Sequence, residues 1–282
     1  MFPATRHLLG AVALASVLFG SQAFAQDKTF HVALDGTFAP HAMPTMSGGI
    51  EGFNVDFTNE IGKRMGAKMD ITATQFSGLI PALQAGTYDF IVAPTTITEE
   101  RAQNLLFSEG YLNTDFQFLV MADGPDVTDL AAFKGMTIAV NKGSVYDSWA
   151  RDLEPKIGWK IESYGTNSDA IQAVMSGRAV ANVAGNTASA WAVKKNPRLK
   201  LSYLHKTGLV WGMPFRKDDT EMRDKVERVI ECLKIDGTMT TLSEKWFGVT
   251  PKEGDAAITP VKGFGQPGFA GYEEDDHKPG CE

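Results

Sequence analysis

Residues 52–111 have the sequence GFNVDFTNEIGKRMGAKMDITATQFSGLIPALQAGTYDFIVAPTTITEERAQNLLFSEGY. Apolar residues recur at helical spacing over Asn54–Met65, and Gly66 marks the end of that helix. A second helix is predicted over Ser77–Ala85, followed by a glycine. Asp89–Ala93 is then predicted to be a short strand. The segment therefore indicates helices and strands in alternation, with a strand end that leads into an arginine.

Arg101 is the first candidate for binding a ligand. Thr98 is a predicted N-cap of a third helix, and Glu99 and Glu100 suit its first turn. A guanidinium in such a turn can hold a carboxylate through two parallel hydrogen bonds. The alternative is a surface arginine paired with Glu99 or Glu100.

The rest of the chain repeats the strand and helix pattern, which favours an α/β fold with mostly parallel sheets covered by helices. The further predicted strands and helices are Thr29–Leu34, Phe116–Met121, Thr137–Val140, Asp169–Met175, Val180–Ala184 and Glu221–Leu233.

An internal sequence repeat suggests two similar lobes. The order of helix, glycine and strand in residues 80–94 recurs without a gap in residues 171–185. Pro94 and Gly185 then become equivalent strand ends. Ligands of open α/β sheets bind beyond the carboxyl ends of strands, so both positions are expected to line one cleft between the lobes.

The N-terminus has the features of a cleaved signal peptide. Arg6 precedes an apolar run over Leu8–Gly20 and a small-x-small site that ends at Ala25. A bilayer-spanning helix needs about 20 apolar residues, so this run is too short. We expect cleavage after Ala25 and a mature protein that is soluble in the periplasm.

The net charge of the chain restricts the kinds of partner that it can bind. The formal net charge is −7, and the loss of residues 1–25 removes Arg6 and no acid. An acidic chain is poorly suited to binding nucleic acid or anionic membrane.

Cys232 and Cys281 are the two cysteines, and an exported chain favours a disulfide between them. The alternative is a buried Cys232 with a free thiol in the tail.

Several short motifs, in this order and spacing, resemble the periplasmic amino-acid-binding proteins of ABC importers, the family 3 extracellular solute-binding proteins. They are GFNVD (52–56), LIPAL (79–83), GTYD (86–89), TITEER (96–101), FS (107–108), LAAFKG (130–135), GS (143–144), SGR (176–178), RKDD (216–219), DGT (236–238) and KWFG (245–248).

The resemblance implies the type II two-lobed periplasmic-binding-protein fold with two hinge crossings, near Phe118–Met121 and Val210–Met213. Lobe 1 would comprise residues 26–118 and 213–250, lobe 2 residues 119–212, and residues 251–282 a Gly/Pro-rich acidic tail. The tail's acidic run at residues 273–276 could bind a metal, but a solvated charge run is the favoured interpretation.

The resemblance also implies roles for individual residues. Arg101 would bind the ligand carboxylate, with the hydroxyl of Thr96 beside it. Asp35 and Phe38 would meet the ligand side chain, although Asp35 could instead stabilise a turn. Phe53 would either cover the ligand or belong to the core. The remaining candidates are Pro94, Ser144, Val145, Tyr146, Gly185 and Asn186.

Gly185 departs from the family pattern, in which an acid at this position holds the ligand ammonium. A buried ammonium without a counter-charge is costly. Asn186 could replace the acid, or an aromatic cage that adds Tyr146 or Trp149 to Phe38 and Phe53 could hold a substituted ammonium. Alternatively, the ligand lacks a free α-ammonium. The sequence therefore predicts specificity for a modified amino acid or related carboxylate.

The predicted function is capture of a small carboxylate by hinge closure and its delivery to an ABC permease and ATPase complex. We expect a monomer with no cofactor, no metal and no catalytic residues. One alternative is an exported cyclohexadienyl-dehydratase-like enzyme, for which Asp35 or Glu51 would have to supply a general acid. The sequence is also compatible with the sensor lobe of a receptor and with a scavenger protein that has lost ligand binding.

Overall fold

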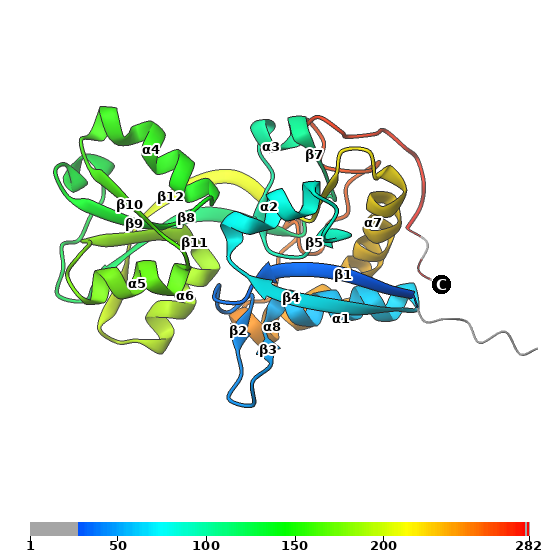
Figure 1. Cartoon of the computed structure of the whole chain (residues 1–282), viewed down its shortest axis with the longest axis horizontal. Helices are drawn as coiled ribbons and strands as arrows, with labels where there is room; N and C mark the ends of the chain where they lie inside the picture. Colours follow the sequence, from blue (N-terminus) through cyan, green and yellow to red (C-terminus); the bar gives the residue numbers. More distant parts are fainter. Residues whose placement is uncertain (1–27, 280, 282) are drawn as a thin grey trace, which may run out of the picture.

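The computed structural model describes residues 28–279 and 281. They form two lobes side by side, with the second lobe at the left of Figure 1 and the first at the right. The predicted signal peptide lies outside the described residues. No helix within these residues combines the length and apolarity needed to cross a bilayer.

The first lobe is built on a parallel sheet of order β4-β1-β5. Its strands are β1 (Lys28–Asp35), β4 (Ala67–Thr74) and β5 (Phe90–Ile91). The short strands β7 (Leu105–Phe107) and β13 (Pro214–Arg216) pair antiparallel, and β2 (Met43–Pro44) with β3 (Ile50–Glu51) forms a hairpin. Its helices are α1 (Phe53–Met65), α2 (Phe76–Gln84), α3 (Glu99–Asn104), α7 (Thr220–Ile235) and α8 (Thr238–Phe247).

The second lobe contains most of a mixed sheet of order β10-β9-β11-β8-β12-β6. Its parallel part consists of β9 (Thr137–Asn141), β10 (Lys160–Tyr164) and β11 (Ala181–Gly185). The elements that accompany this sheet are α4 (Val145–Ile157), α5 (Asn167–Met175), α6 (Asn186–Lys195) and the 3₁₀ turn η1 (Leu130–Phe133).

Two long antiparallel strands join the lobes, β8 (Leu112–Met121) and β12 (Leu199–Gly212). The far end of β12 pairs with β6 (Thr95–Thr96) of the first lobe, with Trp211 opposite Thr96. The end of β12 thus reaches the first lobe at Trp211 and Gly212, and a crossing at Val210–Met213 stays a prediction.

The other crossing lies earlier than the sequence suggested. The stretch Phe116–Val120 of β8 pairs with β11, so it already belongs to the second lobe's sheet. Only the start of β8 is free of that pairing. We therefore place this crossing near 112–115 rather than at Phe118–Met121, and the second lobe begins correspondingly earlier.

The internal sequence repeat corresponds to two similar helix–strand units, one in each lobe. Helices α2 and α5 each have nine residues, and each leads into a buried strand, β5 or β11. Each of the two strands pairs in parallel with a neighbour in its sheet, β5 with β1 and β11 with β9. This repeat directs the ends of β5 and β11 toward the junction between the lobes.

Candidate functional site

A small cavity of about 20 Å³ lies between the lobes, which is room for about one water molecule in this closed arrangement. Small-molecule sites in proteins commonly measure about 300–1,000 Å³, so a solute that enters must widen the cleft or displace the side chains that fill it. Six lining residues come from the first lobe and four from the second. They are Asp35, Phe38, Phe76, Pro94, Thr96 and Arg101, together with Asn141, Ser144, Val145 and Tyr146.

Arg101 enters the cavity from the first turn of α3. Thr98 is the N-cap, and its Oγ1 accepts a hydrogen bond of 3.2 Å from the Arg101 amide. The guanidinium donates to the carbonyls of Thr96 (3.0 Å) and, across the cleft, Gly143 (3.3 Å). No carboxylate of the described residues lies within 4.0 Å of it, so the alternative of an ion pair with Glu99 or Glu100 is not observed.

The electrostatic environment of Arg101 favours an anionic partner. Burial lowers the pKa of its guanidinium to about 10, so the group remains charged at neutral pH. A charge that has lost much of its hydration is stabilised by a nearby opposite charge. Two backbone carbonyls supply only partial charges, and several N–H groups of the guanidinium remain for a ligand.

Asp35 and Asn141 face each other across the cleft. Asp35 ends β1, and its Oδ1 accepts hydrogen bonds from the amide and hydroxyl of Thr37 at 2.9 and 2.7 Å. Its Oδ2 accepts a hydrogen bond of 3.1 Å from Asn141 Nδ2 at the end of β9. Asn141 Oδ1 is buried and has no hydrogen-bond partner among the described residues.

The N-terminus of α4 forms another wall. Ser144 is its N-cap and accepts from the Asp147 amide at 3.2 Å. Val145 and Tyr146 begin the helix, where backbone N–H groups have no intrahelical acceptor and the helix dipole favours an anion. Burial raises the pKa of the Tyr146 hydroxyl, so this side chain is neutral.

Trp211 closes the cavity next to Thr96. Its Nε1 donates to Thr96 Oγ1 at 3.2 Å, and its side chain is almost fully buried. The ring also lies against Gly185. A Cβ on Gly185 would stand 2.6 Å from Trp211 Cζ2 and 2.8 Å from Tyr146 Oη. Both separations are shorter than van der Waals contact, so glycine is required where the family pattern has an acid.

Further hydrogen bonds hold the lobes together. Asn54 Nδ2 donates to the Val92 carbonyl and to Tyr111 Oη, so its Oδ1 accepts from His41 Nδ1 (3.0 Å). In the neutral imidazole, Nε2 then accepts a hydrogen bond of 2.8 Å from Thr187 of the second lobe. The lobes are therefore closed on one another.

The structure does not bring every predicted site residue to the cavity. Phe53 is fully buried and packs against Phe247, with ring centroids 4.9 Å apart. Gly185 lies behind the rings of Trp211 and Tyr146. Asn186 accepts a weak hydrogen bond from the Asp115 amide, 3.4 Å long, instead of facing the cavity. The predicted aromatic cage is incomplete, because Phe38 and Tyr146 line the cavity but Phe53 does not, and Trp149 packs against Phe116.

Three lining or neighbouring residues were not predicted from sequence: Phe76, Asn141 and Trp211. Phe76 begins the helix that follows the carboxyl end of β4, and Asn141 ends β9. Both positions lie at strand ends, where the general rule for open α/β sheets places ligands. Trp211 is found only through the pairing of β12 with β6.

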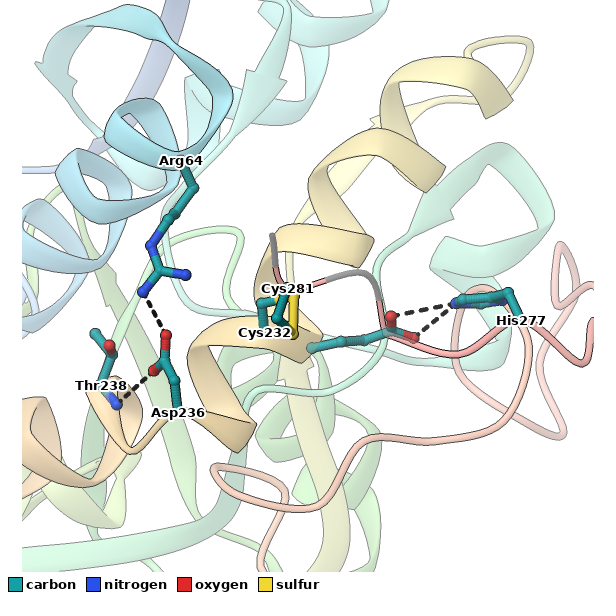
Figure 2. The surroundings of a disulfide bond; sticks show 7 residues. Arg64, Cys232, Asp236, Thr238, His277 and Cys281 are labelled. Atoms are coloured by element: carbon teal, nitrogen blue, oxygen red, sulfur yellow. Dashed lines mark hydrogen bonds and ion pairs between the residues drawn. A yellow bond between two sulfur atoms is a disulfide. The ribbon is translucent and has the colours of Figure 1, made fainter.

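The C-terminal tail is bound to the first lobe. A disulfide joins Cys281 to Cys232 on α7, which confirms the predicted pairing (Figure 2). His277, further back along the tail, contacts Glu231 at 3.0 Å. The acidic side chains of residues 273–276 are exposed, as predicted for a solvated charge run, whereas His277 next to them is packed against the first lobe. Within the described residues no group of three or more His, Cys, Asp or Glu side chains is arranged to hold a metal ion.

Comparison with known proteins identifies consistent relatives. Residues 30–249 match the bacterial extracellular solute-binding proteins, family 3. The L-arginine-binding protein of Pseudomonas aeruginosa is 29% identical over 251 residues, which is 85% of this chain and 95% of that protein.

Solved structures give the same result. An ancestral arginine-binding protein bound to arginine has a TM-score of 0.75 and 32% identity, covering 78% of this chain and 98% of the other. An ancestral amino-acid-binding protein described as a precursor of cyclohexadienyl dehydratase has a TM-score of 0.73 and 30% identity, covering 78% and 95%. The type II two-lobed fold is thereby confirmed.

Proposed function

Because this chain belongs to the bacterial extracellular solute-binding proteins, family 3, we propose that it captures an amino acid or amino-acid-like carboxylate for an ABC importer. Arg101 is the group that binds the carboxylate. The observation that carries this assignment is the unpaired guanidinium inside a cavity shared by both lobes. The hydroxyl of Thr96 and the first turn of α4 stand beside it as further donors.

Ligand binding is coupled to closure of the cleft. Arg101 and Asp35 belong to one lobe, whereas Asn141 and Ser144 belong to the other. A solute can touch all four only when the lobes are shut, so it binds the closed state better and shifts the hinge equilibrium toward it. The permease then recognises the closed form and accepts the solute, and no bond in the ligand is broken.

Replacing Arg101 by alanine tests this function. In a thermal-shift screen of amino acids and related carboxylates, the unaltered protein should gain stability with its ligand by mass action. Loss of charge-assisted bidentate bonding should weaken affinity by at least about 100-fold, so Arg101→Ala should lose the shift. Arg178→Ala, which removes an exposed guanidinium of the second lobe, is the matched control and should retain it. An unchanged shift in Arg101→Ala would refute the assignment.

The cellular setting follows from the family. The protein acts outside the cytoplasm, as its relatives do, and we propose that cleavage after Ala25 releases a soluble periplasmic monomer. Intact mass of the secreted protein tests the cleavage site, and sedimentation tests the monomer. A retained N-terminal segment or a stable dimer would refute the respective point.

An enzyme on this fold is the second candidate, since one structural relative is a dehydratase precursor. Asp35 is the sole carboxylic acid among the cavity-lining residues that the structure describes. It already accepts three hydrogen bonds, which suits a fixed carboxylate better than a general acid. Turnover of prephenate or arogenate by the purified protein would favour the enzyme, whereas binding without turnover supports the transport function.

A further inference from the structure

We propose that the cavity selects solutes whose negative and positive groups lie at opposite ends, such as ω-amino and ω-guanidino carboxylic acids, over α-amino acids. This inference rests on the proposed capture of a carboxylate by Arg101. It names the ligand class from the arrangement of donors and acceptors in the cavity.

The surroundings of Arg101 offer donors, and Gly185 supplies no counter-charge where the family pattern has an acid. Arg101 supplies the positive charge, and Thr96 Oγ1 already accepts from the indole of Trp211, which leaves its own hydroxyl proton to donate. The first turn of α4 adds N–H groups. An ammonium on the carbon next to the carboxylate would therefore be buried beside like charge and donors, which is strongly unfavourable.

The structure also explains why no acid stands at this end. The place of a side chain on Gly185 is filled by Trp211 Cζ2 and Cη2, at 2.6 and 2.8 Å from the position of a Cβ, and by Tyr146 Oη at 2.8 Å. Trp211 is held there by its bond to Thr96 and by the edge-on ring of His41, with centroids 4.8 Å apart. The Trp211 and Tyr146 side chains therefore occupy the place where an acid at position 185 would bind an α-ammonium.

The acceptors are collected around Asp35 instead. A carboxylate can only accept, so the Asn141 amide must turn Nδ2 toward Asp35, which leaves Oδ1 as the free acceptor. That Oδ1 is buried and unpartnered among the described residues. Asp35 has no Lys, Arg or His nitrogen within 4.0 Å in the described part of the chain. An ammonium or guanidinium would satisfy both groups at once.

The two unpaired charges therefore define the ligand. Arg101 and Asp35 line the same cavity without pairing with each other, so the ligand supplies the complement of each. The rings of Phe38 and Phe76 line the same cavity and suit a chain of methylene groups that connects the two ends. The Phe76 ring lies 5.8 Å from the Arg101 guanidinium carbon, so it stands next to the carboxylate end.

Matched pairs of probes test the inference by calorimetry on the unaltered protein. Lysine is compared with ε-aminocaproic acid, and arginine with δ-guanidinovaleric acid, since each pair differs by the α-ammonium alone. The des-amino compound of at least one pair should bind about tenfold or more tightly than its partner, given the cost of an uncompensated buried charge. Agmatine, which has an ammonium in place of the carboxylate, and valeric acid, which has no cationic group, should bind more weakly than the des-amino compounds.

Variants then locate the two ends. Asn141→Leu should weaken the des-amino probes by about tenfold, because a buried Asp35 loses one donor and the cation loses one acceptor, while valeric acid is unaffected. Asp70→Asn, an exposed acid of the first lobe, is the control. The double variant Gly185→Asp with Trp211→Ala opens the filled position and should reverse the preference within each pair.

The outcomes separate the inference from the function on which it rests. Tighter binding of lysine and arginine than of both des-amino compounds would overturn the inference and leave carboxylate capture intact. Failure of every carboxylate to bind would instead reject the proposed function. The probe comparison is decisive even if the double variant does not fold, because it uses the unaltered chain.

Discussion

Two groups of buried charges in this molecule differ in how they are completed. In the cavity, Arg101 and Asp35 have no partner of opposite charge within 4.0 Å among the described residues. Below the C-terminal tail, Glu109 and Lys234 are fully buried and form an ion pair of 2.7 Å. We propose that a ligand supplies the partners of the first group, whereas the chain itself supplies those of the second.

The tail makes the second group possible. Its Val261 amide donates to Glu109 at 2.6 Å, and its Gly265 amide donates to both oxygens of buried Glu227, at 2.7 and 2.9 Å. Burial raises the pKa of the Glu109 and Glu227 carboxyl groups and lowers the pKa of Lys234, and the mutual attraction of the ion pair opposes both effects. A buried charge is therefore evidence for a ligand only where the protein leaves it unpaired.

The largest expected effect is on folding, from Lys234→Met. It leaves Glu109 buried without its counter-charge, which typically costs about 3–5 kcal/mol. Because the folded-state pKa of Glu109 then rises further, the variant should recover stability as pH falls and the carboxyl group is protonated. Urea unfolding at two pH values measures this, with exposed Lys225→Met on the same helix as control.

Ligand affinity of Lys234→Met sharpens the comparison. Since the tail-covered group makes no contact with the cavity lining, carboxylate affinity should stay within about threefold of the parent, or less than 1 kcal/mol. A large loss of affinity in a folded variant would show that the two groups are not independent.

The disulfide should have the next largest effect. It anchors Cys281 at the end of the tail to Cys232, 49 residues away in sequence. Its loss in Cys232→Ser with Cys281→Ser should lower stability by about 2–4 kcal/mol. Arg223 still holds the tail through the Gly271 carbonyl and Glu273, so a folded protein should remain. Thermal unfolding of the oxidised parent and the double variant provides the measurement; equal melting points would contradict it.

A further effect concerns the pH dependence of stability, because burial holds the pKa of His41 at about 3 instead of 6.5. Below pH 6.5, His41 is protonated in the unfolded chain but stays neutral in the folded protein. The contribution of His41 to the free energy of unfolding therefore decreases as the pH falls below 6.5. The slope from this one group is at most about 1.4 kcal/mol per pH unit.

His41→Gln should remove that part of the pH dependence. The raised pKa of Glu109 and Glu227 acts in the opposite direction, so the informative quantity is the difference in slope between parent and variant from pH 6.5 to 4. Identical slopes for the parent and His41→Gln would show that His41 titrates normally.

Local signals in the sequence predicted much of the fold. Residues close in the chain determine the cap at Thr98, the repeat around Gly185 and the two predicted helices Asn54–Met65 and Ser77–Ala85. The observed helices α1 and α2 begin and end within one residue of these predicted bounds. The disulfide followed from the export signal and the cysteine count. These features need no knowledge of tertiary packing.

The cavity was predicted only in part, because its walls come from distant segments. Phe53 and Phe76 are both buried aromatic residues at helix starts, and only packing decides which one lines the cavity. The sequence shows that position 185 has a glycine instead of an acid. The sequence does not show the reason, because Trp211 reaches that position only through the pairing of β12 with β6.

A structure of the protein with a bound carboxylate probe is the most direct test. The carboxylate oxygens should accept two hydrogen bonds from the Arg101 guanidinium at about 2.7–2.9 Å, with the lobes closed and the cationic end beside Asp35 and Asn141. A ligand seated elsewhere, or an Arg101 side chain turned out to solvent in the occupied protein, would contradict the account.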